Sequence, residues 1–215
     1  MTTVTSPIPD RRRPGESSQL LAAYVGRRAT QLQSRYLAQD PRARADLARL
    51  RRAVGRSPGS DPAAWDVIFR DFPPELMGRN DAPSPAELAV NAALCLFGVH
   101  LQSADKPMHV QDQGLGRAVR LLSRPEDTET FSAPTMRRFH ALGTATSLVE
   151  VLHHARGLIQ QFRAGGIGLD YGRLADDFYW LQRPASADNV RLRWARDLYR
   201  IDPQTENSPE KEISE

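Results

Sequence analysis

Helix-start signals constrain this chain more than any other feature of its sequence. Each signal is a helix-capping residue placed directly before a proline, which is favoured at the first helical position. Asp40-Pro41, Asp61-Pro62 and Ser84-Pro85 are such pairs, and each stands before a segment with helical apolar periodicity. No sustained alternation of apolar and polar residues with hairpin turns, the pattern of β-strands, is found. The sequence therefore predicts an all-α protein.

The apolar periodicity of the chain predicts about nine helices, which we expect to form a bilobed bundle. The segment 85–103 is apolar on nearly all sides, so we expect it to be central and buried. Left-handed C-caps are expected at Gly55 and at Gly165-Gly166, and Asp170 is placed to cap the helix that follows it. The expected helices cover residues 18–38, 41–54, 62–70, 85–103, 113–123, 134–145, 147–164, 171–182 and 187–200.

Two polar segments divide the chain: the loop from Ser103 to Gln113 and the acidic linker at 124–131. The C-terminal tail carries five acids and one lysine and has no apolar stripe. We therefore expect four regions: a disordered N-terminal arm (1–17), an N-terminal helical lobe (18–110), a C-terminal helical bundle (111–200) and a disordered acidic tail (201–215).

The cysteine count and the length of the apolar runs bear on the cellular compartment. Cys95 is the single cysteine, which excludes an internal disulfide and suits a reducing cytoplasm. No apolar run reaches the roughly 18 residues of a membrane span. The basic N-terminus is not followed by the apolar stretch of a secretory signal. We expect a cytoplasmic protein that does not associate with membranes.

Residues suited to catalysis or metal binding form no recognisable pattern. The histidines include no pair four residues apart with a glutamate between them, and Cys95 alone cannot build a zinc site. The segment AGGIGLDYG follows a predicted helix and lacks the Gly-Lys-Ser/Thr ending of a phosphate loop, so a C-cap turn explains it better. We expect no enzyme activity, no metal site and no cofactor. The five histidines are His100, His109, His140, His153 and His154.

Two further groups of residues are better assigned to structural roles. Asp170, Asp176 and Asp177 resemble an acid cluster for a metal, but Asp170 is needed as a cap. Asp177 lies four residues after Arg173, which is the spacing of a helical ion pair. Four aromatic residues are able to stack on bases, but each lies in a predicted helix with apolar neighbours, which favours core packing. These residues are Trp65, Trp180, Trp194 and Tyr199.

Arginine dominates the charge of the chain. It supplies 27 of the 29 basic residues, and residues 1–200 carry 28 bases against 21 acids. A GC-rich genome would produce the same preference for arginine codons. Whatever its origin, the guanidinium group offers forked donors that match the geometry of phosphate.

The helix expected at 41–54 places most of its arginines away from the core. On a helical wheel Leu47, Leu50 and Val54 share one stripe, and Asp46 is the only acid in the segment. A solvated surface would be expected to intersperse more acids, because like charges three or four residues apart repel. The pattern therefore favours an anion-binding face. Its arginines are Arg42, Arg49 and Arg52 opposite the stripe, Arg44 and Arg51 at its flank, and Arg56 just beyond.

The same arrangement recurs on three later helices, each with an apolar stripe and outward arginines. Asp197 can pair with Arg193 on the last of them. Several basic faces on one small protein suggest a long polyanion. No helix-turn-helix pattern with base-reading Asn or Gln is present, so contact with the nucleic-acid backbone is favoured. The faces are Arg117, Arg120 and Arg124 opposite Leu115, Val119 and Leu122; Arg137 and Arg138 opposite Met136, Phe139 and Leu142; and Arg193, Arg196 and Arg200.

Five motifs in a fixed order make the chain resemble a known family. They are LRRAVGRSPGSDPAAW, ALCLFGVHLQS followed by KPMH, LGRAVRLL, RRFHAL and GIGLDYGRLADDFYWLQRPASADNVRLRWARDLYR. Over about residues 18–200 the chain is similar to the small subunit, of the Cse-type or CasB family, of the type I-E CRISPR Cascade complex. The resemblance implies an all-helical, non-catalytic subunit that is present as a dimer beside the backbone and large subunits. It also implies contact with guide RNA and with target and non-target DNA, and R-loop stabilisation in antiviral defence.

The arginine faces and the resemblance together give one set of candidate contacts to nucleic acid. Two alternative functions stay open. One is a helical protein–protein adaptor whose basic faces meet acidic partner surfaces, and the second is a helical nuclease, which the missing metal ligands disfavour. The candidate contact residues are Arg49, Arg51, Arg52, Arg56, Lys106, Arg117, Arg120, Arg137 and Arg138.

Overall fold

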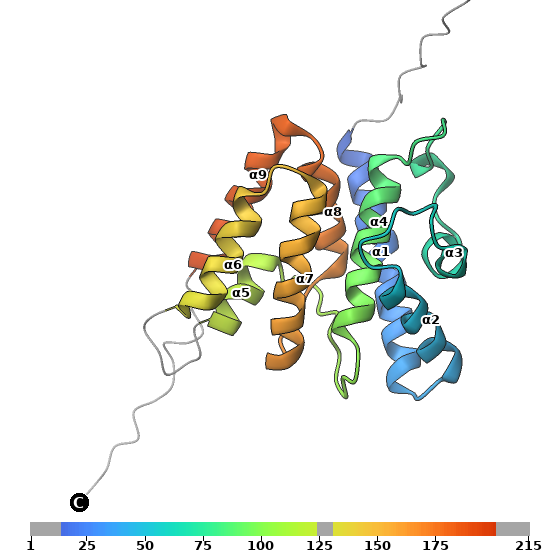
Figure 1. Cartoon of the computed structure of the whole chain (residues 1–215), viewed down its shortest axis with the longest axis horizontal. Helices are drawn as coiled ribbons and strands as arrows, with labels where there is room; N and C mark the ends of the chain where they lie inside the picture. Colours follow the sequence, from blue (N-terminus) through green and yellow to red (C-terminus); the bar gives the residue numbers. More distant parts are fainter. Residues whose placement is uncertain (1–13, 124–130, 201–215) are drawn as a thin grey trace, which may run out of the picture.

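The structure is a computed structural model that describes residues 14–123 and 131–200, and in these ranges the chain forms nine α-helices (Figure 1). A short 3-10 turn, η1 (Pro74–Leu76), lies between α3 and α4. Within these ranges the β-type pairing is limited to an isolated bridge, so the predicted all-α fold is confirmed. The helices are α1 (Pro14–Leu37), α2 (Pro41–Arg52), α3 (Pro62–Phe69), α4 (Pro85–His100), α5 (Leu115–Ser123), α6 (Ala133–Thr144), α7 (Leu148–Gly165), α8 (Tyr171–Leu181) and α9 (Pro184–Tyr199).

The three predicted helix starts are confirmed. The side chains of Asp40 and Asp61 accept hydrogen bonds from backbone N–H groups in the first turns of α2 and α3. At α4 a capping box forms, since the Glu87 N–H donates to Ser84 Oγ (3.0 Å) and the Ser84 N–H donates to Glu87 Oε2 (2.6 Å). Each cap satisfies backbone donors that have no partner inside the helix.

The first helix begins earlier than expected. α1 begins at Pro14, so residues 14–17, which were expected in the arm, are helical. A proline and an acid, Glu16, both suit the first turn of a helix, and Ser17 and Ser18 are buried there. The rest of the expected arm, the linker residues 124–130 and the tail at 201–215 lie outside the described residues.

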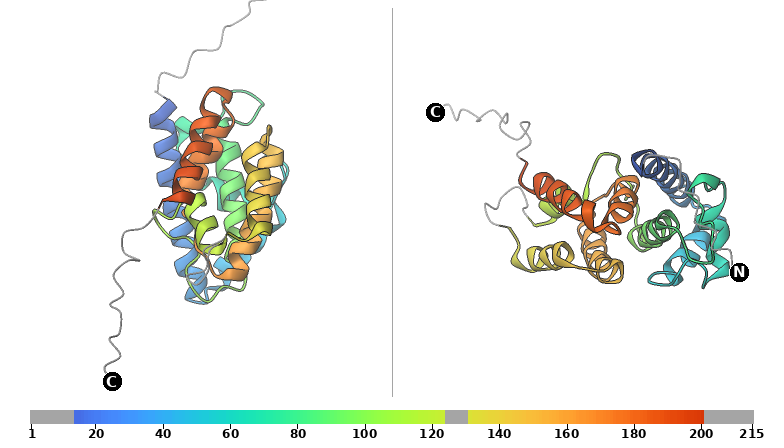
Figure 2. Two further views of the ribbon diagram at one scale, coloured as in Figure 1. Left: turned by 90° about the vertical axis from the view of Figure 1, so that its left-hand side faces the viewer. Right: turned by 90° about the horizontal axis from the view of Figure 1, so that it is seen from above.

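α4 lies at the centre of the molecule, as its composition predicted. Helices α1, α2, α7 and α8 pack around it (Figures 1 and 2). Its buried side chains point in all directions and include the polar Asn91 and His100. Because α4 has no solvent face along most of its length, its neighbours must enclose it.

A single apolar core joins the two halves of the chain. α8 packs against α1 and α4, while α5 packs against α9 and α6 packs against α7 (Figure 2). Buried apolar side chains form one cluster that extends from Leu21 in α1 to Leu198 in α9. The expected boundary near residue 110 lies in the loop between α4 and α5.

The buried side chain of Gln33 ties that loop to α1. Gln33 Oε1 accepts hydrogen bonds from the backbone N–H groups of Met108 (2.8 Å) and His109 (2.7 Å), and Gln33 Nε2 donates to the His109 carbonyl (3.2 Å). A buried amide that is bonded at both of its ends fixes the backbone opposite it, because breaking these bonds would leave buried polar groups unpaired.

Asp170 ties the other end of the same loop to α8. As predicted it caps α8, because Asp170 Oδ1 accepts from the N–H groups of Gly172 (2.9 Å) and Arg173 (3.1 Å). Its Oδ2 accepts from the Asp112 N–H (2.8 Å), and the Asp170 N–H donates to the Gln113 carbonyl (2.8 Å). We call the contacts of Gln33 and Asp170 with this loop the polar joint.

Three helix crossings are close because a glycine stands at each. A Cβ atom at Gly98 of α4 would lie 2.9 Å from Leu50 Cβ of α2, and one at Gly172 of α8 would lie 2.7 Å from the Ala22 carbonyl oxygen of α1. A Cβ at Gly116 of α5 would overlap the backbone of α9. These contacts are shorter than real Cβ contacts, so a larger residue would push the helices apart.

The expected C-caps are confirmed at one of two places. Gly166 ends α7 in the left-handed conformation, with φ of 63°. Gly55 also has a left-handed φ, 78°, but the residue that caps α2 is Ala53. Gly55 therefore belongs to the turn that follows α2.

The expected ion pairs within α8 and α9 are wrong. Arg173 does not pair with Asp177 but reaches across to α9, where its Nη2 lies 3.1 Å from Asp197 Oδ2. This contact also removes Asp197 from its expected partner, Arg193. The helical spacing allowed both expected pairs, but the packing of α8 on α9 offers each charge a partner on the other helix.

Asp177 instead lies buried between α8 and α9. It accepts hydrogen bonds from Trp194 Nε1 (2.6 Å) and from Arg193 Nη2 (2.6 Å), and Arg193 also reaches Asp176 (3.1 Å). Burial raises the pKa of Asp177 to about 6, and the bonds from Arg193 and Trp194 counteract part of that rise. A buried carboxylate of this kind depends on its cationic partner.

Replacing Gly98 with alanine should separate α2 from α4. The added methyl group meets Leu50 at a distance that forces a backbone shift, which we expect to cost about 1–3 kcal/mol of unfolding free energy. The matched control is Gly143→Ala in α6, where a Cβ meets nothing within 4 Å and alanine should be neutral or stabilising. Denaturant unfolding of both variants measures the difference. Equal stabilities would contradict the close crossing.

Replacing Arg193 with leucine should leave the Asp177 carboxylate buried without a cation. We expect a loss of about 3 kcal/mol at pH 7.5. Because the folded-state pKa of Asp177 is raised to about 6, acid neutralises the orphaned carboxylate, and the loss should shrink as the pH falls from 8 to 5. Arg196→Ala, at an exposed position of the same helix, should change stability by no more than about 0.5 kcal/mol at any of these pH values. A pH-independent loss for Arg193→Leu would contradict this account.

Candidate nucleic-acid interface

The structure places the arginines of α2 as the helical wheel predicted. Leu47 and Leu50 are buried and Val54 is half-buried against the core. Arg52 is exposed, together with the arginines at 42 and 44, whereas Arg51 is half-buried. The core side of α2 and its basic side are therefore separate surfaces.

Two of the candidate arginines in this region have carboxylate partners. Arg49 Nη1 lies 2.7 Å from Asp46 Oδ1, and Arg56 Nη1 lies 3.7 Å from Asp61 Oδ2. Such pairs at a protein surface contribute little stability but neutralise the charge locally. Within the described residues Arg51 and Arg52 form no ion pair, which makes them the stronger candidates on α2.

Arg51 lies among other cations. Partial burial lowers the pKa of Arg51, and the positive charges of Arg52 and Arg163 lower it further. Arg163 is in the last turn of α7 and donates to Gln102 Oε1 (3.1 Å), so the end of α7 lies beside the residues that follow α4. A guanidinium held beside like charges gains from any anion that binds there.

Lys106 joins the same region from the loop after α4. A Cβ at Gly166 would lie 2.7 Å from Lys106 Nζ, so the ammonium group rests over the cap of α7. A cation at a helix C-terminus is also favoured by the helix dipole, which explains part of this position without a ligand. We call Arg51, Arg52, Lys106 and Arg163 the α2–α7 corner.

Arg163 is a member of this corner that the sequence analysis missed. Its position in the last turn of a helix that ends at a glycine pair was the only local signal, and cations are common at such positions. Its proximity to Arg51 depends on the packing of the whole bundle.

The two described arginines of α5 differ in their exposure. Arg117 is exposed, while Arg120 is half-buried and its Nη1 donates to the backbone carbonyl of Arg200 beyond α9. Arg120 therefore helps to hold the end of α9 on α5. Arg124, which was expected on the same face, lies outside the described residues.

Arg137 and Arg138 of α6 border a second cationic site, a hollow of about 430 Å³ between α6 and α7. Arg138 lies flat across Gly157 of α7, where a Cβ would overlap its guanidinium group. Both arginines are exposed, and none of the described residues that line the hollow is a carboxylate. We call this the α6–α7 hollow; its lining residues are Pro134, Arg137, Arg138, His153, His154 and Gln161.

The aromatic residues divide between core and surface. Trp194 is buried as predicted and Trp180 is half-buried. The prediction of core packing is wrong for Trp65, which is 45% exposed while its Nε1 donates to the Pro58 carbonyl (2.9 Å). It is also wrong for Tyr199, which is 63% exposed. Trp65 lies in the short helix α3, and Tyr199 is the last residue of α9.

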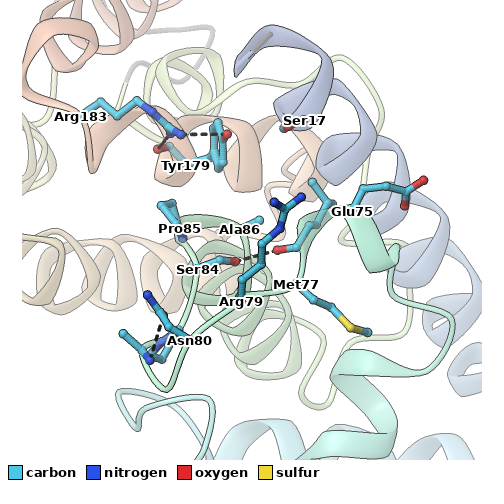
Figure 3. A pocket seen from close by; sticks show the side chains of 14 residues that line it. Ser17, Glu75, Met77, Arg79, Asn80, Ser84, Pro85, Ala86, Tyr179 and Arg183 are labelled. Carbon is cyan, nitrogen blue, oxygen red and sulfur yellow. Dashed lines mark hydrogen bonds between the residues drawn. The ribbon is translucent and has the colours of Figure 1, made fainter. Parts of the chain in front are cut away.

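A further hollow, of about 350 Å³, lies beside the start of α4 (Figure 3). Arg183 lies over the Tyr179 ring, with its Cζ 4.1 Å from the ring centroid, and donates to the Tyr179 hydroxyl (2.9 Å). The lining combines these groups with Arg79 and the capping residue Ser84. Among the described residues that line it no nucleophile is paired with a base, so it does not resemble a catalytic site.

Two further findings concern residues 14–123 and 131–200. No group of three histidine, cysteine, aspartate or glutamate side chains there is placed to hold a metal ion. No helix in the same ranges combines the length and the apolar composition that crossing a membrane requires.

Comparison with known proteins supports the resemblance seen in the sequence. The family model described as CRISPR-associated protein Cse2 matches residues 46–199. The crystal structure of CasB from Thermobifida fusca is 31% identical with a TM-score of 0.70, and the match covers 84% of this chain and 98% of that chain. CasB from Thermus thermophilus shares the fold, with 23% identity, a TM-score of 0.57, and coverage of 81% and 97%. A search of curated proteins found no match. Since the family model spans well over half of the sequence, the chain belongs to the Cse2 (CasB) family of CRISPR-associated proteins.

Proposed function

We propose that this protein is the non-catalytic small subunit of a type I-E CRISPR Cascade complex and binds the backbones of guide RNA and DNA. There it stabilises the R-loop and the displaced strand in antiviral defence, as a dimer beside the backbone and large subunits. The observation that carries the proposal is a pair of cationic sites, the α2–α7 corner and the α6–α7 hollow, whose main arginines form no ion pair within the described residues.

Separate cationic sites on one small protein suit a long polyanion. A small ligand would occupy one site, whereas successive phosphates of a strand can occupy both. Arginine forks bind phosphate oxygens without reading the base sequence, and the released counterions make such binding depend on salt. We therefore expect little sequence preference.

This binding mode suits an RNA-guided complex. Guide pairing supplies the sequence specificity there, and the exchange of a DNA duplex for an RNA–DNA duplex is nearly balanced. Contacts from a protein to the strand backbones tip that balance toward the open state. No nucleophile, metal ligand or base needs to take part.

A protein–protein adaptor is the second candidate, and exposed apolar side chains favour it. Val149 at the start of α7 is 78% exposed, and Tyr199 and Trp65 also face outward. Residues of this kind mark contact surfaces between proteins more often than contacts to a phosphate backbone. A subunit of a large assembly needs both kinds of surface, so the two functions are compatible.

Replacing Arg51 and Arg52 together with alanine should weaken binding to DNA and RNA of arbitrary sequence. Log affinity should fall linearly with log salt for the wild type, by about 0.9 per phosphate contacted on duplex DNA. In the double variant that slope should become less steep by roughly 1 for each phosphate that the variant no longer neutralises. Stability should change by about 0.5 kcal/mol or less for each substitution. Fluorescence anisotropy at several salt concentrations measures the affinity and its salt slope, and denaturant unfolding measures the stability.

The matched control removes two arginines that already have carboxylate partners. Arg35 pairs with Asp40 (2.7 Å) and Arg70 pairs with Asp66. Arg35→Ala/Arg70→Ala loses the same formal charge, but it should keep the wild-type salt slope because these two arginines are already paired with carboxylates. Identical slopes in the two double variants would show that net charge, and not the α2–α7 corner, determines binding.

Replacing Gly157 with alanine should displace Arg138 without unfolding the protein. Alanine favours a helix by about 1 kcal/mol over glycine, and the atoms it would strike belong to the end of a flexible side chain. We expect an unchanged or higher melting temperature, with a loss of affinity similar to that of Arg138→Ala. The combined variant should bind like either single variant, because both changes remove the same interaction with phosphate. Additive losses would contradict this account of the α6–α7 hollow.

A further inference from the structure

The polar lining of the α6–α7 hollow comes from two helices. α6 supplies Arg137 and Arg138, and α7 supplies His153, His154 and Gln161. The two imidazole rings lie edge to face, with their centroids 5.2 Å apart. His153 is exposed and His154 is half-buried, and both line the hollow. Four nitrogen-rich side chains, two arginines and two histidines, therefore converge on a space of about 430 Å³.

One polar atom in this lining has no partner among the described residues. Gln161 Oε1 is buried and accepts no hydrogen bond from them. An unsatisfied buried acceptor is unfavourable, so this part of the lining is not fully satisfied by the described residues alone.

The charged groups around the two imidazoles are mostly positive. Arg137 and Arg138 face them from α6, and Arg156 is exposed on α7 itself. An acid on the same helix, Glu150, accepts at its Oε2 from the Thr146 N–H (2.9 Å) and hydroxyl (3.2 Å). These bonds lower the pKa of Glu150, with a smaller contribution from His154. This acid is thus already engaged at the start of α7.

A phosphate in the hollow adds negative charge beside the two imidazole rings. Without an anion there, a proton added to either imidazole meets the positive charges of the two arginines. A bound phosphate offers the same proton a negative partner and charge-assisted hydrogen bonds. Imidazole is the side chain that ordinarily changes its charge between pH 5 and 8. Binding and protonation therefore favour each other.

We propose that the α6–α7 hollow binds a phosphate of the nucleic-acid backbone together with protons taken up by His153 and His154. Acid then strengthens nucleic-acid binding by this subunit. The inference rests on the nucleic-acid binding proposed above and adds a proton linkage to one of its two sites.

The other histidines are separable from this effect. Burial lowers the pKa of His100 to about 4, so His100 stays neutral between pH 6 and 8. His109 lies in the loop of the polar joint, where its Nδ1 accepts from the Tyr171 N–H (3.2 Å). His140 is exposed on α6 but does not line the hollow, so it serves as the matched control.

The test is the affinity of the full chain for a labelled single-stranded oligonucleotide of arbitrary sequence between pH 6 and 8, at constant salt. We expect the wild type to bind roughly tenfold more tightly at pH 6 than at pH 8. His153→Gln/His154→Gln should lose most of this increase, while His140→Gln should retain it. Calorimetry in two buffers of different ionisation enthalpy should detect proton uptake by the wild type and by His140→Gln only.

Two different failures are distinguishable. If the wild type binds with the expected salt slope but the double histidine variant keeps the full pH dependence and proton uptake, the proton linkage is wrong and the proposed function stands. If the wild type does not bind the oligonucleotide at any pH, the proposed function fails, and the proton linkage fails with it. Circular dichroism of each variant at both ends of the pH range verifies that it is folded.

Discussion

The enclosure of α4 is the constraint on which the rest of the structure depends. A helix that is apolar on all sides is stable only when other helices cover it. In this protein α4 is covered by α1, α2, α7 and α8. The glycine at position 98 lets α2 approach closely, and this places the end of α2 beside the end of α7. The α2–α7 corner is therefore a product of core packing, although none of its residues belongs to the core.

Much of the fold was predictable because its signals are local. A capping side chain followed by proline acts within one turn, so the starts of α2, α3 and α4 follow directly from the sequence. Partner choice among charges was not predictable, because it depends on helices that meet only in the folded chain. Arg173 illustrates this, since its helical spacing offers Asp177 while the α8–α9 contact offers Asp197.

The candidate nucleic-acid interface was also only partly predictable from the sequence. The wheel of α2 separates Leu47 and Leu50 from Arg52 because helical geometry fixes that division. The wheel does not show that Arg56 is paired with an acid, since its partner comes from the next helix start. Nor does it show Arg163, which joins the corner only through folding. Faces are local properties, whereas sites that combine several helices are not.

The contact between α1 and α8 bears on how the chain is synthesised. α1 leaves the ribosome first, but the chain from Leu37 to Tyr171 must follow before α8 can cover it. At about 5–20 residues per second this takes on the order of ten seconds. During that interval α2 and α4 can pack on α1, but the surface of α1 that α8 covers in the finished protein stays exposed. A large part of the surface of α1 therefore becomes buried only after most of the chain has been made.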